Sequence, residues 1–307
     1  MPSDTICLLC GKQKTLCKSH IIPKFVFRWI KKTSTTGYFR KSENLNIRFQ
    51  DGEKRPLLCS DCEELFSRYE SEFAKNIFYP YVQTEMDSWG CQTGKIKSFK
   101  YDDWLLKFII SAQFRFCSQE CDNADKVFGE KRTKILKEQV RIWRDYLLEK
   151  RSDTGENRSY IIFLQNLVFG HGYLPEQLSD RVNFYLLRSV DSTLFYDNAN
   201  LGSYLKLGPM LILTSLIPST LSKMNSVMIK KNGELDTVQN LRNPRINHYI
   251  FVDRPREAMQ RMIIPEKQRM QISKYVEMNS QKTPESIAVR AAFSDKVLKL
   301  MRAKRKE

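Results

Sequence analysis

The sequence predicts an α+β protein in three parts, and three observations carry this prediction. Two Cys-x-x-Cys pairs and a lone histidine lie near the N-terminus, a layout typical of a small zinc-stapled module. Apolar side chains then recur at helical spacing. Short β-branched and aromatic runs, separated by turn residues, follow in the second half of the chain. We therefore expect a zinc-binding module at residues 1–80, a helical segment at 81–155 and a mixed α+β C-terminal domain at 156–307.

The N-terminal module is expected to contain two short strands and a helix. Ile21-Ile22-Pro23 predicts a strand that runs into a turn, and Pro56-Leu57-Leu58 predicts a strand that leads into the second cysteine pair. Apolar residues recur at helical spacing after Cys62, so a helix begins near this pair. Pro80 is expected to end that helix, because proline interrupts helical hydrogen bonding.

Two apolar stripes predict helices between residues 101 and 150. The first stripe comprises Trp104, Leu105, Phe108, Ile109, Ala112 and Phe116, and the second Ile135, Ile142, Trp143, Tyr146 and Leu147. The polar run at 151–158 then predicts a loop or linker.

Short apolar runs predict strands in the C-terminal domain. They lie at residues 182–187, 193–196, 204–207, 210–217 and 248–252, with turn residues at Asn198-Ala199-Asn200 and Gly208-Pro209. Residues 227–229 and 235–238 flank Lys-Asn-Gly-Glu, which predicts a β-hairpin. Two helices are expected to follow, the last of which begins at Thr283-Pro284-Glu285.

The charge of the chain points to a polyanionic partner. The 307 residues include 51 basic and 35 acidic side chains, a formal charge of +16. Such a surplus attracts nucleic acid, although it could also serve only to keep the protein in solution. The sequence contains neither a signal peptide nor an apolar run of about 18 residues, so we expect a cytoplasmic protein without a membrane partner.

The cysteine spacing predicts a structural zinc ion. Eight cysteines without a secretory signal are more typical of metal ligands and core thiols than of disulfides. Two ligand sets fit the spacing. One is Cys7, Cys10, Cys59 and Cys62; the other, which is local, is Cys7, Cys10, Cys17 and His20. Cys117 and Cys121 lie four residues apart in a predicted helix and are interpreted as core thiols.

The N-terminal motifs resemble those of zinc-containing HNH endonucleases, a branch of the His-Me finger group. The resemblance rests on Cys7-x-x-Cys10, then Ser19-His20-Ile21-Ile22-Pro23, then Leu57-Leu58-Cys59-x-x-Cys62-Glu63. It covers about residues 5–75. It implies a ββα-metal module of the treble-clef or HNH-like type, with a Cys₄ zinc site beside a catalytic metal.

The resemblance assigns a role to individual residues. His20 matches the general base of the family, and Glu63 stands where a ligand of the catalytic metal is common. That metal would be Mg²⁺ or Mn²⁺, held by Glu63 and by Asp51. Ser19 replaces the acid or histidine that usually precedes the base, and the middle asparagine has no clear counterpart. The other two histidines, His171 and His248, are interpreted as structural.

Basic residues after the motif histidine are candidates for phosphate binding. These are Lys24, Arg28, Lys31 and Lys32. Trp29 and its neighbouring phenylalanines could stack on bases, but at helical spacing such rings are more often core.

Three functions remain in competition at this point. The first is a metal-dependent HNH-type nuclease that hydrolyses phosphodiester bonds of DNA or RNA. The second is a non-catalytic zinc module that binds nucleic acid through its charge. The third is an interaction protein in which the zinc module is a structural cap, with a protein partner or a second copy bound through the C-terminal region.

Overall fold

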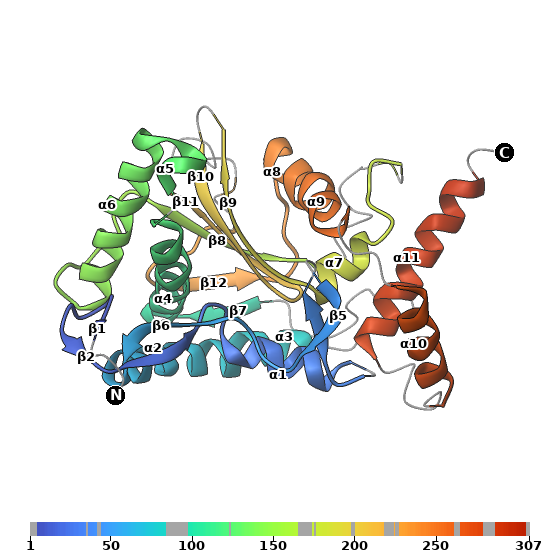
Figure 1. Ribbon diagram of the computed structural model, residues 1–307. Coiled ribbons are helices and arrows are strands. Elements are labelled where there is room, and N and C mark those ends of the chain that lie inside the picture. Colours follow the sequence, from blue (N-terminus) through green and yellow to red (C-terminus); the bar gives the residue numbers. More distant parts are fainter. Residues whose placement is uncertain are drawn as a thin grey trace.

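The N-terminal part is built around one long-range strand pair. The computed structural model describes residues 5–34, 36–41, 44–83, 98–122, 124–164, 174, 176–197, 200–217, 224, 227–260, 265–278 and 286–304. Its first elements are β1 (Thr5–Ile6), β2 (Gln13–Lys14), β3 (Leu16–His20), α1 (Lys24–Lys32), β4 (Phe39–Lys41), β5 (Asn44–Phe49), β6 (Lys54–Cys59) and α2 (Ser60–Phe73). Strand β3 pairs antiparallel with β6, from Leu16 opposite Cys59 to His20 opposite Lys54. The segment between these strands contains α1 and the β4–β5 hairpin (Figure 1).

Two N-terminal predictions are wrong in detail. No strand forms at Ile21-Ile22-Pro23: β3 precedes this segment and ends at His20, and both isoleucines are buried in irregular backbone. Pro23 has no N–H to continue a ladder and instead caps α1. Pro80 does not end the helix that begins at Ser60. A π-helical turn η1 (Ala74–Phe78) leads into α3 (Tyr79–Val82), and Pro80 occupies the first turn of α3, where proline is tolerated.

The middle of the chain is helical as predicted. Its elements are β7 (Ser98–Tyr101), α4 (Asp103–Glu120), α5 (Ala124–Phe128) and α6 (Glu130–Leu147), followed by a loop to β8 (Arg158–Phe163). The strand predicted at 56–58 and the loop predicted at 151–158 are also confirmed within one or two residues. Helix α4 is buried on nearly every side, because the module, α6 and the central sheet surround it.

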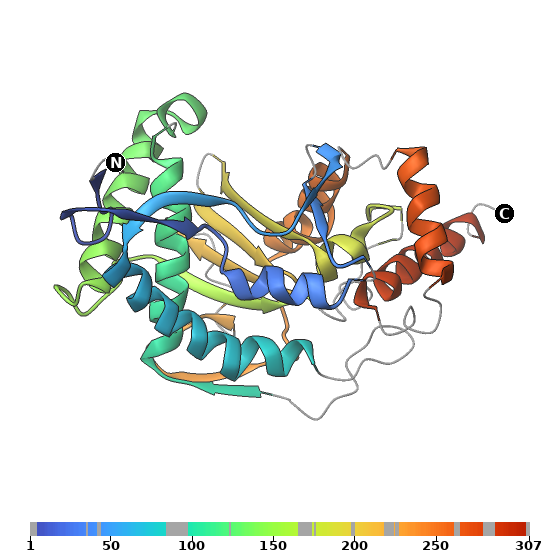
Figure 2. The same cartoon turned by 60° about the horizontal axis from the view of Figure 1, so that its bottom comes forward.

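The centre of the molecule is an antiparallel sheet in the order β8-β11-β10-β9. It comprises β8, β9 (Val190–Tyr196), β10 (Leu201–Leu207) and β11 (Met210–Ser215). Alternate side chains point to opposite faces. One face packs on α1, α3 and α4, and the other on C-terminal helices (Figures 1 and 2). The predicted turn at Gly208 joins β10 to β11, with a positive φ of 65°.

Three sequence predictions for the C-terminal domain are wrong. Residues 182–187 form a helix, α7 (Val182–Arg188), and residues 248–252 lie in helical turns. Short apolar runs do not distinguish a buried helix from a buried strand. The hairpin predicted around 231–234 does not form, because β12 (Gly233–Asp236) pairs with the distant β7 and Met228 bridges to Tyr160.

The remaining helices cover the sheet and extend to the C-terminal end. They are α8 (Pro244–His248), η4 (Tyr249–Asp253), α9 (Arg254–Gln260), α10 (Glu266–Met278) and α11 (Ile287–Lys304). Two final helices were predicted, but the expected start at Thr283-Pro284-Glu285 lies outside the described residues, as does His171. Asp295 of α11 accepts hydrogen bonds from the backbone N–H groups of Asn183 and Phe184, at 2.8 and 3.0 Å, and so caps α7. Among the described helices, none is long and apolar enough to cross a membrane.

One hydrophobic cluster draws on all three predicted parts of the chain. It joins Trp29 of α1, Phe108 of α4 and Leu205 of β10, with their neighbours. Arg188 extends this contact, since its Nη2 donates to the carbonyl oxygen of Ile30 at 2.8 Å. The N-terminal module is therefore packed directly on the central sheet.

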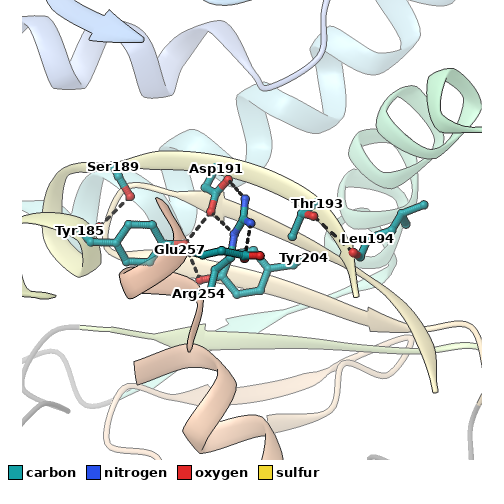
Figure 3. A network of polar contacts seen from close by, with 8 residues as sticks. All are labelled: Tyr185, Ser189, Asp191, Thr193, Leu194, Tyr204, Arg254 and Glu257. Carbon is teal, nitrogen blue, oxygen red and sulfur yellow. Dashed lines mark hydrogen bonds and ion pairs between the residues drawn. The ribbon is translucent and has the colours of Figure 1, made fainter. Parts of the chain in front are cut away.

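A buried polar network fastens α9 to the start of β9 (Figure 3). Arg254 donates two hydrogen bonds to Asp191, each of 2.7 Å, and Tyr185 donates a third of 2.6 Å. Burial alone would lower the pKa of Arg254, but the bonds to Asp191 outweigh it and raise that pKa. Lys206, opposite Asp191 in the ladder, is fully buried, and burial lowers its pKa well below the ordinary value.

Asp191→Asn should destabilise the fold by about 3 kcal/mol, because Arg254 loses its buried carboxylate partner and keeps only the exposed Glu257, and because the buried Lys206 loses the carboxylate opposite it. The measurement is chemical denaturation of the variant and the wild type. Glu138→Gln is the control, since Glu138 pairs with Arg141 on the exposed face of α6 and should leave the midpoint unchanged. Equal stability of the Asp191→Asn variant and the wild type would contradict this account.

Candidate metal centre and active site

Four cysteines come together at the end of the β3–β6 pair. The Sγ atoms of Cys7, Cys10, Cys59 and Cys62 all lie within 4.8 Å of one another, and those of Cys10 and Cys59 are 3.9 Å apart. A tetrahedral zinc ion with Zn–S bonds of about 2.3 Å needs sulfur atoms about 3.8 Å apart. The cluster could therefore hold one zinc ion through four thiolates.

The backbone explains how residues so distant in sequence meet. Gly11 has a positive φ of 71°, and its N–H donates to the carbonyl oxygen of Cys7 at 2.9 Å, which folds the first pair into a tight turn. The N–H of Leu8 donates to the carbonyl oxygen of Leu57 at 3.0 Å. The N–H of Cys59 donates to the sulfur of Cys7 at 3.4 Å. These bonds fasten the first knuckle to the end of β6.

The thiols of the cluster need a cation to ionise together. Burial raises the pKa of Cys62 far above its ordinary value, and the neighbouring Cys59 and Cys7 raise it further. A zinc ion reverses this preference, because it binds the deprotonated sulfur.

The local ligand set is excluded by the geometry. Cys59 and Cys62 complete the cluster with Cys7 and Cys10, whereas Cys17 and His20 lie outside it. Cys117 and Cys121 behave as core thiols, as predicted. Cys117 is fully buried, and burial raises the pKa of Cys121 to about 11.

His20 and Asp51 form a direct pair. Nε2 of His20 lies 2.8 Å from Oδ1 of Asp51, although 31 residues separate them in the chain. The N–H of Gly52 donates to the same oxygen at 2.9 Å, and Nζ of Lys54 lies 2.5 Å from Oδ2. Burial opposes ionisation of Asp51, but the bonds from Lys54 and His20 outweigh it and hold the pKa well below the ordinary value. Asp51 is therefore an anion at neutral pH.

Glu63 does not join this pair. It follows the second cysteine pair in the first turn of α2, and its charge raises the pKa of Cys17, after the larger effect of burial. Among the described residues, its buried Oε1 has no hydrogen-bond partner, and the same holds for Oγ of the fully buried Ser19. The structure thus brings His20 and Asp51 together, and Glu63 acts on Cys17 instead.

The candidate phosphate-binding residues lie on the outer face of α1. Lys24, Arg28 and Lys32 are exposed and Lys31 is half-buried. The opposite face of the helix is buried in the core and comprises Phe25, Val26, Phe27, Trp29 and Ile30. Trp29 and the phenylalanines therefore serve the core and are not free to stack on bases. His248, interpreted from the sequence as structural, is about half exposed and lies 3.4 Å from Asp253.

Sequence reasoning did not find the groove that runs along β9. Its volume is about 940 Å³, and its lining includes Phe195, Tyr249, Glu120, Arg245 and Asp253. Burial raises the pKa of Glu120, and the charge of Glu53, two residues after Asp51, raises it further. The residues of the groove are scattered over six helices and strands and the segments between them, so no local sequence pattern predicts it.

Comparison with protein-family models, with curated proteins and with solved structures finds no match to this chain. The cysteine cluster and the His20–Asp51 pair are therefore the observations on which a functional proposal has to rest.

Purified protein should contain about one zinc ion per chain, and Cys59→Ser should lose it, because three thiolates bind zinc more weakly than four. The measurement is elemental analysis after gel filtration. Cys17→Ser is the matched control and should keep its zinc, since Cys17 lies outside the cluster. Loss of zinc in Cys17→Ser, or no zinc in the wild type purified without chelator, would contradict the assignment.

Proposed function

We propose that this chain is a metal-dependent HNH-type nuclease that hydrolyses phosphodiester bonds of DNA or RNA. The observation that carries the proposal is the His20–Asp51 pair, placed on a strand pair and helix that a four-cysteine cluster could hold together. The order of these elements supports it. A cysteine knuckle, strands β3 and β6, and helix α2 follow one another as in the ββα-metal, or treble-clef, layout that the sequence motifs resemble.

His20 is the proposed general base. A carboxylate can only accept a hydrogen bond, so the contact with Asp51 keeps the proton of a neutral imidazole on Nε2. Nδ1 is then left with a lone pair. In the proposed reaction Nδ1 takes a proton from water as the water oxygen bonds to phosphorus. The bond from phosphorus to the leaving oxygen breaks in the same step, and that oxygen takes a proton from solvent.

Asp51 is assigned a positioning role in place of the metal-binding role expected from the sequence. Its two carboxylate oxygens already accept bonds from His20, Gly52 and Lys54. A cation would have to compete there with the charged Nζ of Lys54. Asp51 instead fixes the tautomer and orientation of His20, as carboxylates do for catalytic histidines in general.

Glu63 and Ser19 fit the expected Mg²⁺ or Mn²⁺. Each has a buried oxygen without a partner among the described residues, and hard divalent cations prefer oxygen ligands. When bound there, the ion would stabilise negative charge on the leaving oxygen. Lys24, Arg28, Lys31 and Lys32 would hold the phosphates on either side.

A second function is supported by one observation. Ser19 offers a neutral oxygen where an anionic or imidazole ligand is common in the family, and this weakens the proposed cation site. A module that has lost the cation would still bind nucleic acid through the basic face of α1. A cleavage assay distinguishes the nuclease from the non-catalytic module that only binds nucleic acid.

His20→Ala should lower the cleavage rate on the order of 10²–10⁴-fold, because the base acts in the transition state. The measurement is cleavage of plasmid DNA, single-stranded DNA and RNA with Mg²⁺ or Mn²⁺, and with EDTA. Zinc content should stay unchanged. Undiminished cleavage by the variant would show that the chemistry lies elsewhere, and no cleavage by the wild type on any substrate would favour the non-catalytic module.

Asp51→Asn and Glu63→Gln should both lower the cleavage rate, but the rates of the two variants should respond differently to Mn²⁺. Asp51→Asn keeps the shape of the side chain but removes its charge, so the cleavage rate should fall at every Mn²⁺ concentration. Glu63→Gln should be partly restored by excess Mn²⁺, because its defect is weaker binding of the cation. A manganese titration of both variants is the measurement. Rescue of Asp51→Asn alone would show that Asp51 binds the cation.

A further inference from the structure

Strand β9 is an open edge of the central sheet. In the order β8-β11-β10-β9 it pairs with β10 on one side and, within the described part of the chain, with no strand on the other. Such an edge is a template for an additional strand, and proteins commonly shield it with proline, lysine or a covering segment. Residues 190–196 contain neither proline nor lysine. The sequence of β9 therefore does nothing to prevent pairing.

The register identifies the backbone groups on this edge. The N–H of Leu216 donates to the carbonyl oxygen of Leu201 at 2.8 Å, so the odd-numbered residues of β10 bond to β11 and the even-numbered ones to β9. The even-numbered residues of β10 lie opposite odd-numbered residues of β9. The backbone N–H and C=O groups of Ser192, Leu194 and Tyr196 therefore point away from the sheet.

These groups have little else to bind. Among the described residues, no backbone group outside the sheet bonds to them. The carbonyl oxygen of Leu194 accepts a bond of 3.3 Å from the hydroxyl group of Thr193 (Figure 3). This bond is long for a hydroxyl donor, so the N–H of a paired strand would replace it readily.

The groove along β9 contains this open edge. Its lining includes every residue from Thr193 to Asp197. Successive side chains of a strand point to opposite faces, so a hollow that is lined by consecutive residues is lined by the edge of the strand itself. The lining stretch is about 14 Å long, and an added strand would occupy it with about five residues.

The two walls of the groove pack on opposite faces of the sheet. Phe195 packs on Tyr249 of η4, with ring centres 6.0 Å apart, and the next residue, Tyr196, packs on Phe128 of α5 at 5.2 Å. Figure 1 shows β9 between α5 on one side and α8 and α9 on the other. A segment paired with β9 would therefore present its alternate side chains to these two walls.

The charges of the walls favour a basic segment. Four acidic and two basic residues line the groove, although the chain as a whole carries a formal charge of +16. One of the basic residues, Arg254, already pairs with Asp191 and Glu257. Glu120 is half-buried and forms no ion pair or hydrogen bond within the described part of the chain, and burial raises its pKa. A lysine or arginine in the groove would supply its missing counter-charge.

We propose that the groove along β9 binds an extended basic segment of a partner protein, which pairs with β9 as a fifth strand of the central sheet. Main-chain bonds to Leu194 and Tyr196 would hold the segment. Its basic side chains would face Glu120 on one wall and Asp253 and Glu257 on the other. The proposal is independent of the nuclease activity and gives the central sheet a binding role of its own.

The test uses synthetic peptides and the full chain. The probe is a fluorescein-labelled peptide of seven residues in which lysine and valine alternate, and its anisotropy is measured as wild-type protein is added. We expect saturable binding. A peptide of the same sequence with a methyl group on every backbone nitrogen keeps the charge but cannot donate main-chain bonds, so it should bind about tenfold more weakly.

Glu120→Gln locates the binding site. It removes one carboxylate from the groove and should weaken binding of the probe about fivefold, the effect of one partly exposed ion pair. Glu64→Gln is the matched control. It removes the same charge from the exposed face of α2, where Glu64 pairs with Arg68 at 2.8 Å, and should bind the probe as the wild type does. The melting temperature of each variant establishes that it is folded.

Three results would overturn the proposal. They are no saturable binding at millimolar peptide, equal affinity for the methylated peptide, which would reduce the effect to charge, and equal affinity of the Glu120→Gln variant and the wild type. Gel filtration tests a different occupant. A dimer that the peptide dissociates would assign the edge to a second copy of this chain and overturn the choice of a partner protein. None of these results depends on whether the protein cuts nucleic acid.

Discussion

The position of His20 depends on the sulfur cluster at the other end of the same strand pair. Cys59 ends β6 opposite Leu16, while His20 lies opposite Lys54 at the far end of the ladder. Backbone bonds from Leu8 and Cys59 attach the first knuckle to this pair. Strands of five and six residues are too short to be stable alone in water. A zinc ion on the four thiolates would add the binding free energy that holds both strands and the start of α2 in one register.

The other end of the strand pair is held by the body of the protein. Trp29 of α1 packs so closely on Gly208 that a Cβ there would lie 2.6 Å from the ring. Arg188 stacks on Trp29 at 5.3 Å and donates to the last turn of α1, where the helix dipole favours a cation. Burial lowers the pKa of Arg188 to about 10, so it stays charged at neutral pH. The C-terminal part of the chain therefore fixes the direction of the basic face of α1.

The sequence predicted elements whose signals are local and missed those that depend on distant partners. The helices of the middle segment follow from apolar stripes, and the strand before Cys59 from its apolar run. Residues 182–187 were mistaken for a strand because their partner, Asp295 at the cap of α7, is more than 100 residues away. The hairpin at 231–234 failed for the same reason, since β7 lies about 130 residues earlier and offers a better edge. The cysteine set was predictable because two identical spacings define it, whereas the contact of His20 with Asp51 depends on how the intervening segment returns to β6.

The distribution of charge decides where a polyanion would lie. The groove along β9 has a lining of both charges, in which Glu120, Asp197, Asp253 and Glu257 outnumber Arg245 and Arg254. Arg254 is already neutralised by Asp191 and Glu257. Phosphates would meet net negative charge there, at a distance too short for salt to screen. The outer face of α1 and the β4–β5 hairpin have the opposite balance. They also flank the His20–Asp51 pair, so a nucleic acid drawn by charge would reach His20 from this side and would leave the groove free for a ligand of another kind.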